Sequence, residues 1–493
     1  MIAAHLPALQ VVLPLLAAPL SVVLRNAALA WMLSLAATWG TLAIALKLLF
    51  LVLDGGPIIY EIGDWAAPWG IEYRVDMASA FVLVIVSAIG SVVILFARTS
   101  VAAEVSSDRV YLFYTMYLLC LTGLLGIAIT GDVFNLFVFL EISSLSSYVL
   151  ISLGRDRRAL TAAYRYLIMG TIGATFYVIG VGMMYMMTGT LNIADLSTLI
   201  PAVADSRTIM AALAFLTVGI CLKLALFPLH LWLPNAYAYA PSVVSAFLAA
   251  TATKVAVYML IRIMFTVFGG IQVVETTPVG PILMTLAIAA MFVGSATAIY
   301  QNNIKRMLAY SSIAQIGYMI LGISLATVTG LTGGIIHLFN HAITKSALFM
   351  VMGCVFLRLG SVAIQDIEGL GRRMPVTMAA FVVAGLSLIG VPLTVGFISK
   401  WYLIMAALES DAWPVAVLIL LSSLLAVIYV WRVVEAAYFR PAPEGAIPLR
   451  EAPISMLVPM WIMTLASVYF GIFATPTIEV AERAAATLLE GVW

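Results

Sequence analysis

The chain has little charge and few cysteines for its length. Only 10% of its 493 residues are charged, against about 25% in an average soluble domain, whereas 64% are hydrophobic. The 24 basic and 23 acidic residues nearly cancel, so no polybasic surface suited to DNA or RNA is expected. These proportions exclude a water-soluble enzyme, a nucleic-acid binder and a disordered scaffold, and they indicate a polytopic membrane protein.

The three cysteines lie inside separate apolar runs, at Cys120, Cys221 and Cys354. None forms a Cys-x-x-Cys pair, which argues against an iron–sulfur cluster, a zinc site or a disulfide framework. No ligation pattern for haem or flavin is evident either. We therefore expect no cofactor and no metal, and we expect the chain to perform no redox chemistry itself.

Apolar runs long enough to cross a membrane are abundant instead. A spanning helix needs about 20 predominantly apolar residues, and this rule predicts an all-α membrane protein with fourteen transmembrane helices. The predicted spans are 6–24, 27–53, 77–97, 110–130, 133–153, 159–187, 209–229, 242–268, 280–300, 308–328, 331–357, 376–408, 413–437 and 454–475.

Basic residues are divided unequally between alternate loops. One side of the predicted membrane carries three of them, Arg74, Arg207 and Arg483, and the other carries fourteen. The positive-inside rule places the fourteen in the cytoplasm of a multi-pass cell-membrane protein, with both termini outside. The acidic, Gly/Pro-rich segment 54–76 is then an external loop. The fourteen are Arg25, Arg98, Arg109, Arg155, Arg157, Arg158, Lys305, Arg306, Arg358, Arg372, Arg373, Arg432, Arg440 and Arg450.

Helices four to eight (110–268) and nine to thirteen (280–437) form blocks of nearly equal length. Five crossings per block is an odd number, so the second block enters the membrane from the opposite face, which is the topology of an inverted repeat. The predicted divisions are therefore helices one to three (1–109), the two repeats, and a last helix with a short tail (454–493).

The fourth helix of each block is interrupted by proline and carries a lysine. One contains Lys223 and Pro228, and the other contains Pro392 and Lys400. Proline removes a backbone N–H, and the carbonyls it frees are tolerated at membrane depth only against protein or a wet cavity. We expect broken helices at both positions.

Seven basic residues fall inside predicted spans. Lys47, Arg165 and Arg262 lie within about two turns of a helix end, where long side chains extend to the membrane surface, and we interpret them in that way. The other four are Lys223, Lys254, Lys345 and Lys400.

Glu141 is the carboxylate nearest to mid-membrane, and Lys254 lies near the middle of its span. A charge at the bilayer centre costs about 2.5–3.5 kcal/mol on insertion scales, so such residues need a reason. Buried ion pairs would explain Glu141 with one lysine and would leave two of Lys223, Lys254 and Lys400 without an acid. A path for protons explains them all.

His337, His341 and Lys345 are spaced four residues apart, so they share one face of a helix over about 12 Å. Imidazole donates and accepts protons near neutral pH, so this ladder suits a proton path. Histidines that only hydrogen-bond a neighbouring helix are the alternative. A zinc site is less expected than either, because no third ligand is near in sequence.

Five segments resemble the antiporter-like subunits shared by respiratory complex I, membrane-bound hydrogenases and the multisubunit Mrp cation/proton antiporters. They are GDVFNLFVFLEISSLSSYVLISLG (131–154), CLKLALFPLHLWLPNAYAYAPSVVSAFLAATATK (221–254), YSSIAQIGYMILG (310–322), HLFNHAITKSALF (337–349) and GVPLTVGFISKW (390–401). The resemblance covers roughly residues 70–440. It implies two inverted five-helix repeats, broken helices seven and twelve, and a lateral chain of buried protonatable groups and water.

The resemblance also implies roles for individual residues. Glu141 corresponds to the carboxylate of helix five and Lys223 to its lysine partner in helix seven. Lys254 corresponds to the relay lysine of helix eight, His337 to the relay histidine of helix eleven, and Lys400 to the terminal lysine of helix twelve. His341 and Lys345 match the same motif, and their roles are less well defined.

Lys400 and the GDVFNLFVFLE segment are most similar to the D-type subunit of Mrp antiporters, whereas the complex I M-type subunit commonly has an acid in helix twelve. The resemblance therefore implies a subunit of a Na⁺/H⁺ antiporter, with Na⁺ or K⁺ as the exchanged cation and Mrp A-, B-, C-, E-, F- and G-type subunits as partners. The alternative is a proton-pumping N-type subunit of a complex I-like or hydrogenase-like complex. A purely structural scaffold is the third reading, under which replacing Glu141 or Lys400 leaves transport intact.

Overall fold

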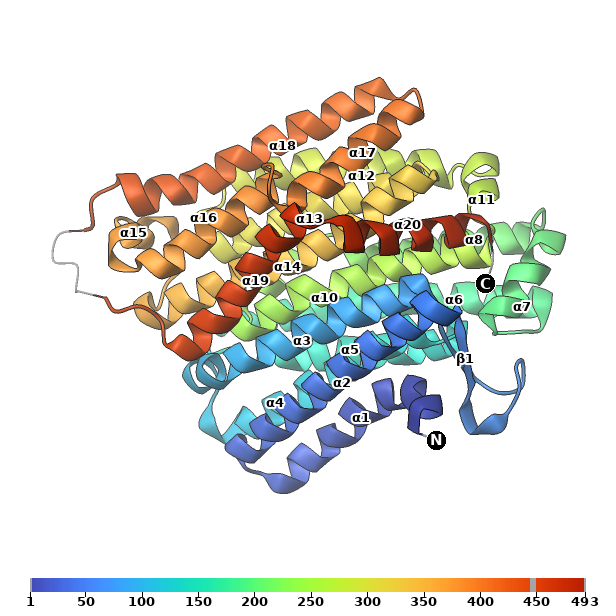
Figure 1. Cartoon of the computed structure of the whole chain (residues 1–493), viewed down its shortest axis with the longest axis horizontal. Helices are drawn as coiled ribbons and strands as arrows, with labels where there is room; N and C mark the ends of the chain where they lie inside the picture. The colour runs from blue at the N-terminus through green and yellow to red at the C-terminus, as the bar shows by residue number, and fades with distance from the viewer. Residues whose placement is uncertain (1, 444–448, 492–493) are drawn as a thin grey trace.

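Long apolar helices run side by side through the computed structural model, which describes residues 2–443 and 449–491 (Figure 1). Thirteen helices in these ranges are long and apolar enough to cross a membrane. They are α1 (Leu6–Leu24), α2 (Ala27–Gly55), α3 (Met77–Glu104), α4 (Val110–Ile129), α5 (Val133–Ser152), α6 (Arg158–Thr188), α8 (Arg207–Leu224), α10 (Ser242–Ile261), α12 (Val279–Ile299), α13 (Ile304–Ser324), α14 (Val328–Leu359), α18 (Trp413–Val434) and α19 (Ile454–Ile472).

The span predicted at 376–408 is two shorter helices, α16 (Pro375–Ile389) and α17 (Val395–Glu409). This pair brings the crossings to the fourteen that the sequence predicts. Pro392 lies in the break between them, and Pro228 lies in a second break between α8 and the short α9 (Leu233–Tyr239). The predicted helix breaks are therefore present, while the inverted relation of the two blocks stays a prediction.

Shorter helical segments join the long ones. The α-helical segments are α7 (Ile193–Leu199), α11 (Ile271–Thr276), α15 (Leu370–Arg373) and α20 (Thr475–Leu489). Helices α10 and α18 continue into π-helical turns, η5 (Arg262–Val267) and η7 (Glu435–Phe439). The single 3-10 turns are η1 (Ile2–His5), η2 (Ile62–Asp64), η3 (Ser107–Arg109), η4 (Ile200–Val203) and η6 (Ile364–Ile367).

The segment predicted as an external loop contains a β-hairpin. Strands β1 (Ile58–Glu61) and β2 (Glu72–Val75) pair antiparallel, with Ile58 opposite Val75. The hairpin lies at the end of the bundle that also holds α7, α11 and both described chain ends (Figure 1). We call this end of the bundle the terminal face. The loops at the opposite end carry most of the fourteen basic residues, and we call that end the basic face.

Helices α10 and α14 form the centre of the bundle. Almost every residue of α10 is buried, and it packs against α3, α8 and α14. Helix α14 is buried from Gly330 to Val355, among α13, α16, α17 and α19. A helix that is apolar on all sides is stable only inside a protein or a membrane. The predicted relay residues on these two helices therefore lie deep within the chain.

Candidate functional site

Glu141 and Lys223 form an ion pair between α5 and α8. Lys223 Nζ lies 3.4 Å from Glu141 Oε1 and donates a 2.8 Å hydrogen bond to Ser144 Oγ. Helix α5 begins where Asp132 accepts from the backbone N–H groups of Phe134 and Asn135. The lysine side chain is 6% exposed and the glutamate side chain 23%, so the carboxylate reaches the outer surface of the chain in mid-helix.

Lys223 occupies the last turn of α8, and the helix ends because Ala225 adopts a left-handed conformation. A cavity of about 30 Å³ separates this lysine from α10, with Ser143, Ser147, Ala252 and Ala256 in its walls. That volume accommodates one water molecule. The break therefore places a charged side chain beside space that water can occupy.

Lys254 lies in the middle of α10 and is 1% exposed. Its ammonium donates to the carbonyl of Ala249 and to Thr253 Oγ1, 3.3 Å away. In the part of the chain that the structure describes, no carboxylate lies within 4.0 Å of it. Lys254 is thus a buried lysine held by neutral groups.

The three residues of the ladder on α14 are all buried. His337 Nδ1 lies 2.8 Å from Ser399 Oγ on α17, and its ring is parallel to that of His341, with 6.2 Å between the ring centroids. Lys345 donates to Ser311 Oγ and to the carbonyl of Leu308, both on α13. The two histidine rings are therefore neighbours on α14, as their spacing predicts, while Lys345 contacts α13.

Unsatisfied nitrogens remain in this ladder. His337 Nε2 and both ring nitrogens of His341 have no hydrogen-bond partner among residues 2–443 and 449–491. The two rings line a cavity of about 10 Å³ together with Gln315 and Asn340. Buried imidazole nitrogens without fixed partners are free to exchange protons with neighbouring groups or water.

Lys400 is held by the end of a helix. It donates to the carbonyls of Ile389, at 2.7 Å, and Leu388, at 3.4 Å, which are the last carbonyls of α16. These carbonyls have no partner within the helix and carry its negative dipole end, so an ammonium is stabilised there. The ammonium also lies 4.9 Å from the ring centre of Tyr318.

Glycines make this arrangement possible. Gly390, at the end of α16, has φ +93°, and a Cβ there would lie 2.9 Å from Lys400 Cδ. A Cβ on Gly396 would lie only 1.8 Å from the carbonyl oxygen of Ser387. The two halves of the broken helix approach closely because glycine occupies both positions.

The predicted residues are connected to different degrees. Glu141 and Lys223 touch directly, and the ring of Tyr318 lies between His337 and Lys400, 5.4 Å from the ring centre of the histidine and 4.9 Å from the ammonium. In the described ranges no hydrogen bond or ion pair links Lys223 to Lys254. The structure therefore gives one ion pair, Glu141–Lys223, and a separate group of neighbouring side chains that contains His341, His337 and Lys400.

The interpretation of Arg262 as a side chain extending to the membrane surface is wrong. Arg262 is 1% exposed and forms an ion pair with Asp76, while its Nε donates to Tyr258 at 2.8 Å. Asp76 caps α3 through Ser79, so the pair joins α3 to α10 at the terminal face. Lys47 and Arg165, by contrast, are exposed on the outer surface of the bundle.

Burial by itself would raise the pKa of Asp76, but the nearby charge and hydrogen bonds of Arg262, with those of Ser79, outweigh it. The pKa of Asp76 therefore lies below its ordinary value. Sequence reasoning missed this pair because its two members are far apart in the chain.

Two further buried charges were missed at the basic face. Lys305 was counted as a loop residue, but it lies in the first turn of α13 and is 3% exposed. Glu104, the last residue of α3, is buried nearby. Within the described residues no group of three or more His, Cys, Asp or Glu side chains is placed to hold a metal ion.

Comparison with known sequences gives a family match over most of the core. Residues 130–426 match the family described as "NADH:quinone oxidoreductase/Mrp antiporter, TM". The chain is 43% identical to the NADH-quinone oxidoreductase N subunit of Desulforudis audaxviator (strain MP104C), covering 95% of this chain and 96% of that one. It is 30% identical to the Na(+)/H(+) antiporter D subunit of Bacillus subtilis (strain 168), covering 98% and 96%.

Solved structures show the same fold. A chain of the Mrp complex from Dietzia sp. DQ12-45-1b superposes with a TM-score of 0.91 at 26% identity, covering 100% of this chain and 98% of that one. A chain of the archaeal membrane-bound sulfane sulfur reductase gives 0.91 at 31%, covering 98% of both. A chain of respiratory complex I from Thermus thermophilus gives 0.77 at 26%, covering 97% and 99%.

Proposed function

Because the chain belongs to the NADH:quinone oxidoreductase/Mrp antiporter transmembrane family, we propose that it conducts protons along its line of buried ionisable groups. The members of this relay are Glu141, Lys223, Lys254, His337, His341, Lys345 and Lys400. The observation that carries the proposal is the Glu141–Lys223 ion pair beside the break in α8, next to a cavity that water can occupy. Structural ion pairing alone does not account for Lys254 and Lys400, which contact no carboxylate in the described ranges.

The relay works by electrostatics. At a separation of 3.4 Å and an effective dielectric constant of about 20, opposite charges attract by about 5 kcal/mol. A proton that neutralises Glu141 removes this attraction, which is large enough to change a proton-transfer equilibrium by roughly three to four orders of magnitude. The disturbance passes to Lys254, then to His337 or His341, and finally to Lys400, with water bridging the gaps between side chains.

The orientation follows from the loops. We place the basic face in the cytoplasm and the terminal face, with both chain ends, outside the cell membrane. The two blocks, 110–268 and 280–437, then act as inverted repeats whose broken helices, with Pro228 and Pro392, hold Lys223 and Lys400 at the two ends of the relay.

Sodium/proton antiport is the first candidate for the coupled process. The 30% identity to an antiporter D subunit and the TM-score of 0.91 with the Mrp complex favour it. In this setting protons flow inward and Na⁺, or K⁺, leaves the cell. The partners are the A-, B-, C-, E-, F- and G-type subunits of an Mrp-like complex.

Redox-driven proton pumping is the second candidate. The 43% identity to the N subunit of an NADH-quinone oxidoreductase and the superposition on the sulfane sulfur reductase complex favour it. Electrons then move in partner subunits, and this chain contributes only the proton path. The same relay residues serve both candidates.

Inside-out vesicles that contain the chain with its partner subunits test the function. The host lacks its own sodium/proton antiporters, and a pH-sensitive dye reports the gradient after Na⁺ or K⁺ is added. Glu141→Gln removes the carboxylate of the ion pair. Glu409→Gln, the same change at an exposed site at the end of α17, is the matched control.

A cation-dependent collapse of the gradient that Glu141→Gln abolishes and Glu409→Gln preserves supports antiport. Acidification on addition of a reductant and quinone, without a response to cations, supports redox-driven pumping. Proton movement that is equal in wild type and Glu141→Gln would refute the relay itself.

A further inference from the structure

Five serines lie along the second half of α5, and one of them has a different hydrogen-bond partner from the rest. Four donate to a carbonyl of α5 itself, at 2.7–2.9 Å: Ser143, Ser146, Ser147 and Ser152. Such bonds are a common way to satisfy a hydroxyl inside a helix. In the described ranges Ser144 forms no bond of this kind, and its oxygen accepts from Lys223 Nζ on α8 at 2.8 Å. Its hydroxyl is therefore directed at the lysine.

Ser144 is a closer partner of Lys223 than Glu141 is. The lysine nitrogen lies 2.8 Å from Ser144 Oγ and 3.4 Å from Glu141 Oε1. Ser144 is 5% exposed, and both Ser144 and Lys223 line the cavity of about 30 Å³ beside α10. The serine therefore fixes the lysine nitrogen between the carboxylate and space for one water molecule.

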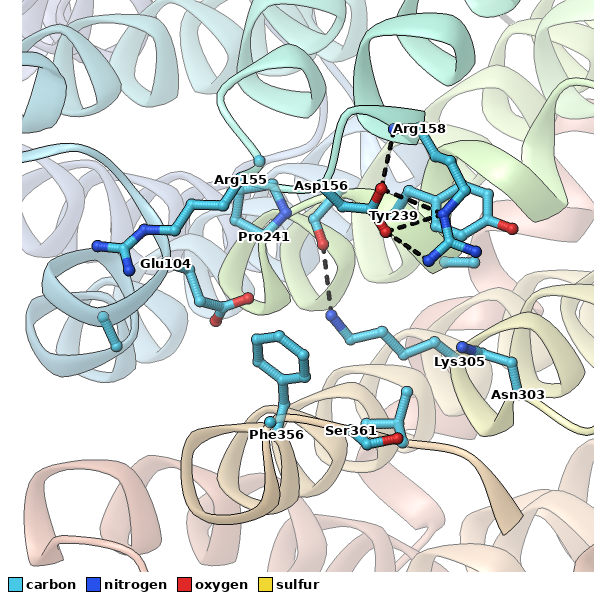
Figure 2. Close-up of a pocket in the computed structure, with 16 residues that line it drawn as sticks. Glu104, Arg155, Asp156, Arg158, Tyr239, Pro241, Asn303, Lys305, Phe356 and Ser361 are labelled. Atoms are coloured by element: carbon cyan, nitrogen blue, oxygen red, sulfur yellow. Dashed lines mark hydrogen bonds and ion pairs between the residues drawn. The ribbon is translucent and has the colours of Figure 1, made fainter. Parts of the chain in front are cut away.

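Other buried lysines are held by groups that only accept hydrogen bonds. Lys305 lines a cavity of about 380 Å³ at the basic face, and it donates to the carbonyl of Ala240 at 3.3 Å (Figure 2). Lys400 donates to the carbonyls of Leu388 and Ile389. A carbonyl oxygen binds an ammonium, but it has no proton to donate to a neutral amine. These contacts therefore suit only the charged form of each lysine.

The hydroxyl beside Lys345 is already engaged. Ser311 Oγ accepts from Lys345, and it donates its own proton to the carbonyl of Leu308 at 2.9 Å. That proton is directed away from the lysine. Ser144 makes no bond to a backbone carbonyl in the part of the chain that the structure describes, so its O–H can turn toward Lys223.

A hydroxyl group can reverse a hydrogen bond because it carries both a proton and lone pairs. While Lys223 is an ammonium, it donates an N–H to Ser144 Oγ. After Lys223 has given up a proton in the relay, its nitrogen carries a lone pair. Rotation about the Cβ–Oγ bond of Ser144 then directs the O–H at this nitrogen. Ser144 gains and loses no proton, and Lys223 keeps a partner in both protonation states.

We propose that Ser144 is a positioning residue that keeps Lys223 Nζ at the wall of the cavity in both protonation states. This role rests on the proposed proton conduction. Glu141 cannot take it over, because an ionised carboxylate only accepts hydrogen bonds. Without the hydroxyl, the neutral amine of Lys223 is buried without its nearest partner, and its formation in the relay becomes slower.

Three variants separate this role from simple packing. Ser144→Ala removes the hydroxyl, Ser144→Thr keeps it and adds a methyl group, and Ser144→Cys replaces it with a thiol, which is a weak donor and a weak acceptor. The positioning role predicts that Thr conducts faster than both Cys and Ala. A site that only needs a small side chain predicts that Ala conducts fastest and Thr slowest.

We expect Ser144→Ala to lower the initial rate of proton translocation by about tenfold and Ser144→Thr to stay within about threefold of wild type. The assay uses inside-out vesicles, with each rate normalised to the amount of assembled complex. Ser146→Ala is the matched control, because Ser146 is 4% exposed on the same helix and donates to the carbonyl of Ile142.

Two results of this assay overturn the proposal. One is a Ser144→Ala rate within about twofold of wild type. The other is a Ser144→Thr complex that assembles normally but conducts no faster than Ser144→Ala.

A solvent isotope effect keeps the test valid if Ser144→Thr fails to assemble. The initial rates are compared in H₂O and D₂O. If the release of a proton by Lys223 limits the rate in Ser144→Ala, its isotope effect is larger than that of wild type and of Ser146→Ala. A slower Ser144→Ala complex with the wild-type isotope effect indicates lost packing and overturns the proposal.

Glu141→Gln is measured in the same vesicles. If it abolishes translocation while Ser144→Ala conducts as wild type, the positioning role is wrong and the relay stands. If Glu141→Gln also conducts normally, the proposed function itself fails.

Discussion

Removal of Arg262 is expected to destabilise the protein strongly. Arg262→Met keeps most of the side-chain volume but leaves Asp76 buried without its ion-pair partner. Both side chains are almost fully buried, at 1% and 7% exposed, so water cannot replace the lost interaction. Asp76 also caps α3, so the uncompensated charge lies at the end of a central helix.

The magnitude follows from this geometry. Breaking a buried ion pair by removing one partner costs about 3–5 kcal/mol. Arg74 lies close enough for its charge to interact with Asp76, so partial compensation places the expected loss near the lower end, at about 3 kcal/mol. The double variant Arg262→Met/Asp76→Asn removes both charges and keeps a capping side chain, so it is expected to recover part of the loss.

Thermal unfolding of the detergent-solubilised complex, followed by size-exclusion chromatography, measures the effect. The double-mutant cycle isolates the coupling between the two side chains. Additive single changes, or a cost of less than about 1 kcal/mol for Arg262→Met, would refute this account. Because the pKa of Asp76 is depressed in the folded protein, the ionised carboxylate stabilises the fold above about pH 4. That contribution is lost as the pH falls through the folded-state pKa.

Other changes test the broken helix, the histidine ladder and the cap of α5. Gly396→Ala places a methyl group against a carbonyl of α16 and is expected to reduce both assembly and proton conduction. Gly182→Ala, which has open space around it, is expected to leave both intact. Immunoblots measure assembly of the two variants, and vesicle assays measure their proton conduction. Ser399→Ala removes the hydrogen bond to His337 and is expected to slow proton conduction by about fivefold at normal expression. The hydroxyl of Ser410 bonds only to the carbonyl of Ala406, so Ser410→Ala is expected to conduct normally. Burial raises the pKa of Asp132 in the folded protein. The protonated form of this carboxyl therefore stabilises the fold below about pH 4, and that stabilisation is lost as the pH rises through the raised folded-state pKa. Asp132→Asn is accordingly expected to unfold at a higher temperature than wild type at pH 7, and a lower unfolding temperature would contradict this account.

The sequence predicts the crossings and the broken helices because both leave local signals. Apolar length marks each span, and proline with a nearby lysine marks each break. The position of Glu141 at membrane depth indicates a basic partner, and the family resemblance, not the spacing of the residues, identifies that partner as Lys223. The proximity of His337 and His341 on one helix face follows from helical spacing, whereas the angle between their rings depends on contacts such as that of His337 with Ser399.

The remaining features depend on contacts between distant segments. Arg262 and Asp76 are 186 residues apart, and the position of Arg262 near a helix end suits a surface residue equally well. Lys400 is held by backbone carbonyls of α16, which carry no mark in the sequence. The burial of Lys305 depends on how α13 packs, which a count of loop charges cannot show. The β-hairpin escaped prediction because each of its strands is only four residues long, too short to stand out in the sequence.

The unpartnered ring nitrogens of His341 have a consequence for the direction of transport. A hydrogen bond to a fixed partner sets which ring nitrogen of a histidine carries the proton. Within the described residues, neither nitrogen of His341 is held in this way. The centre of the proposed relay is then a reversible conductor without a built-in polarity. For the proposed relay, we therefore expect the direction of net proton flow to be set by the gradient or reaction that drives the complex.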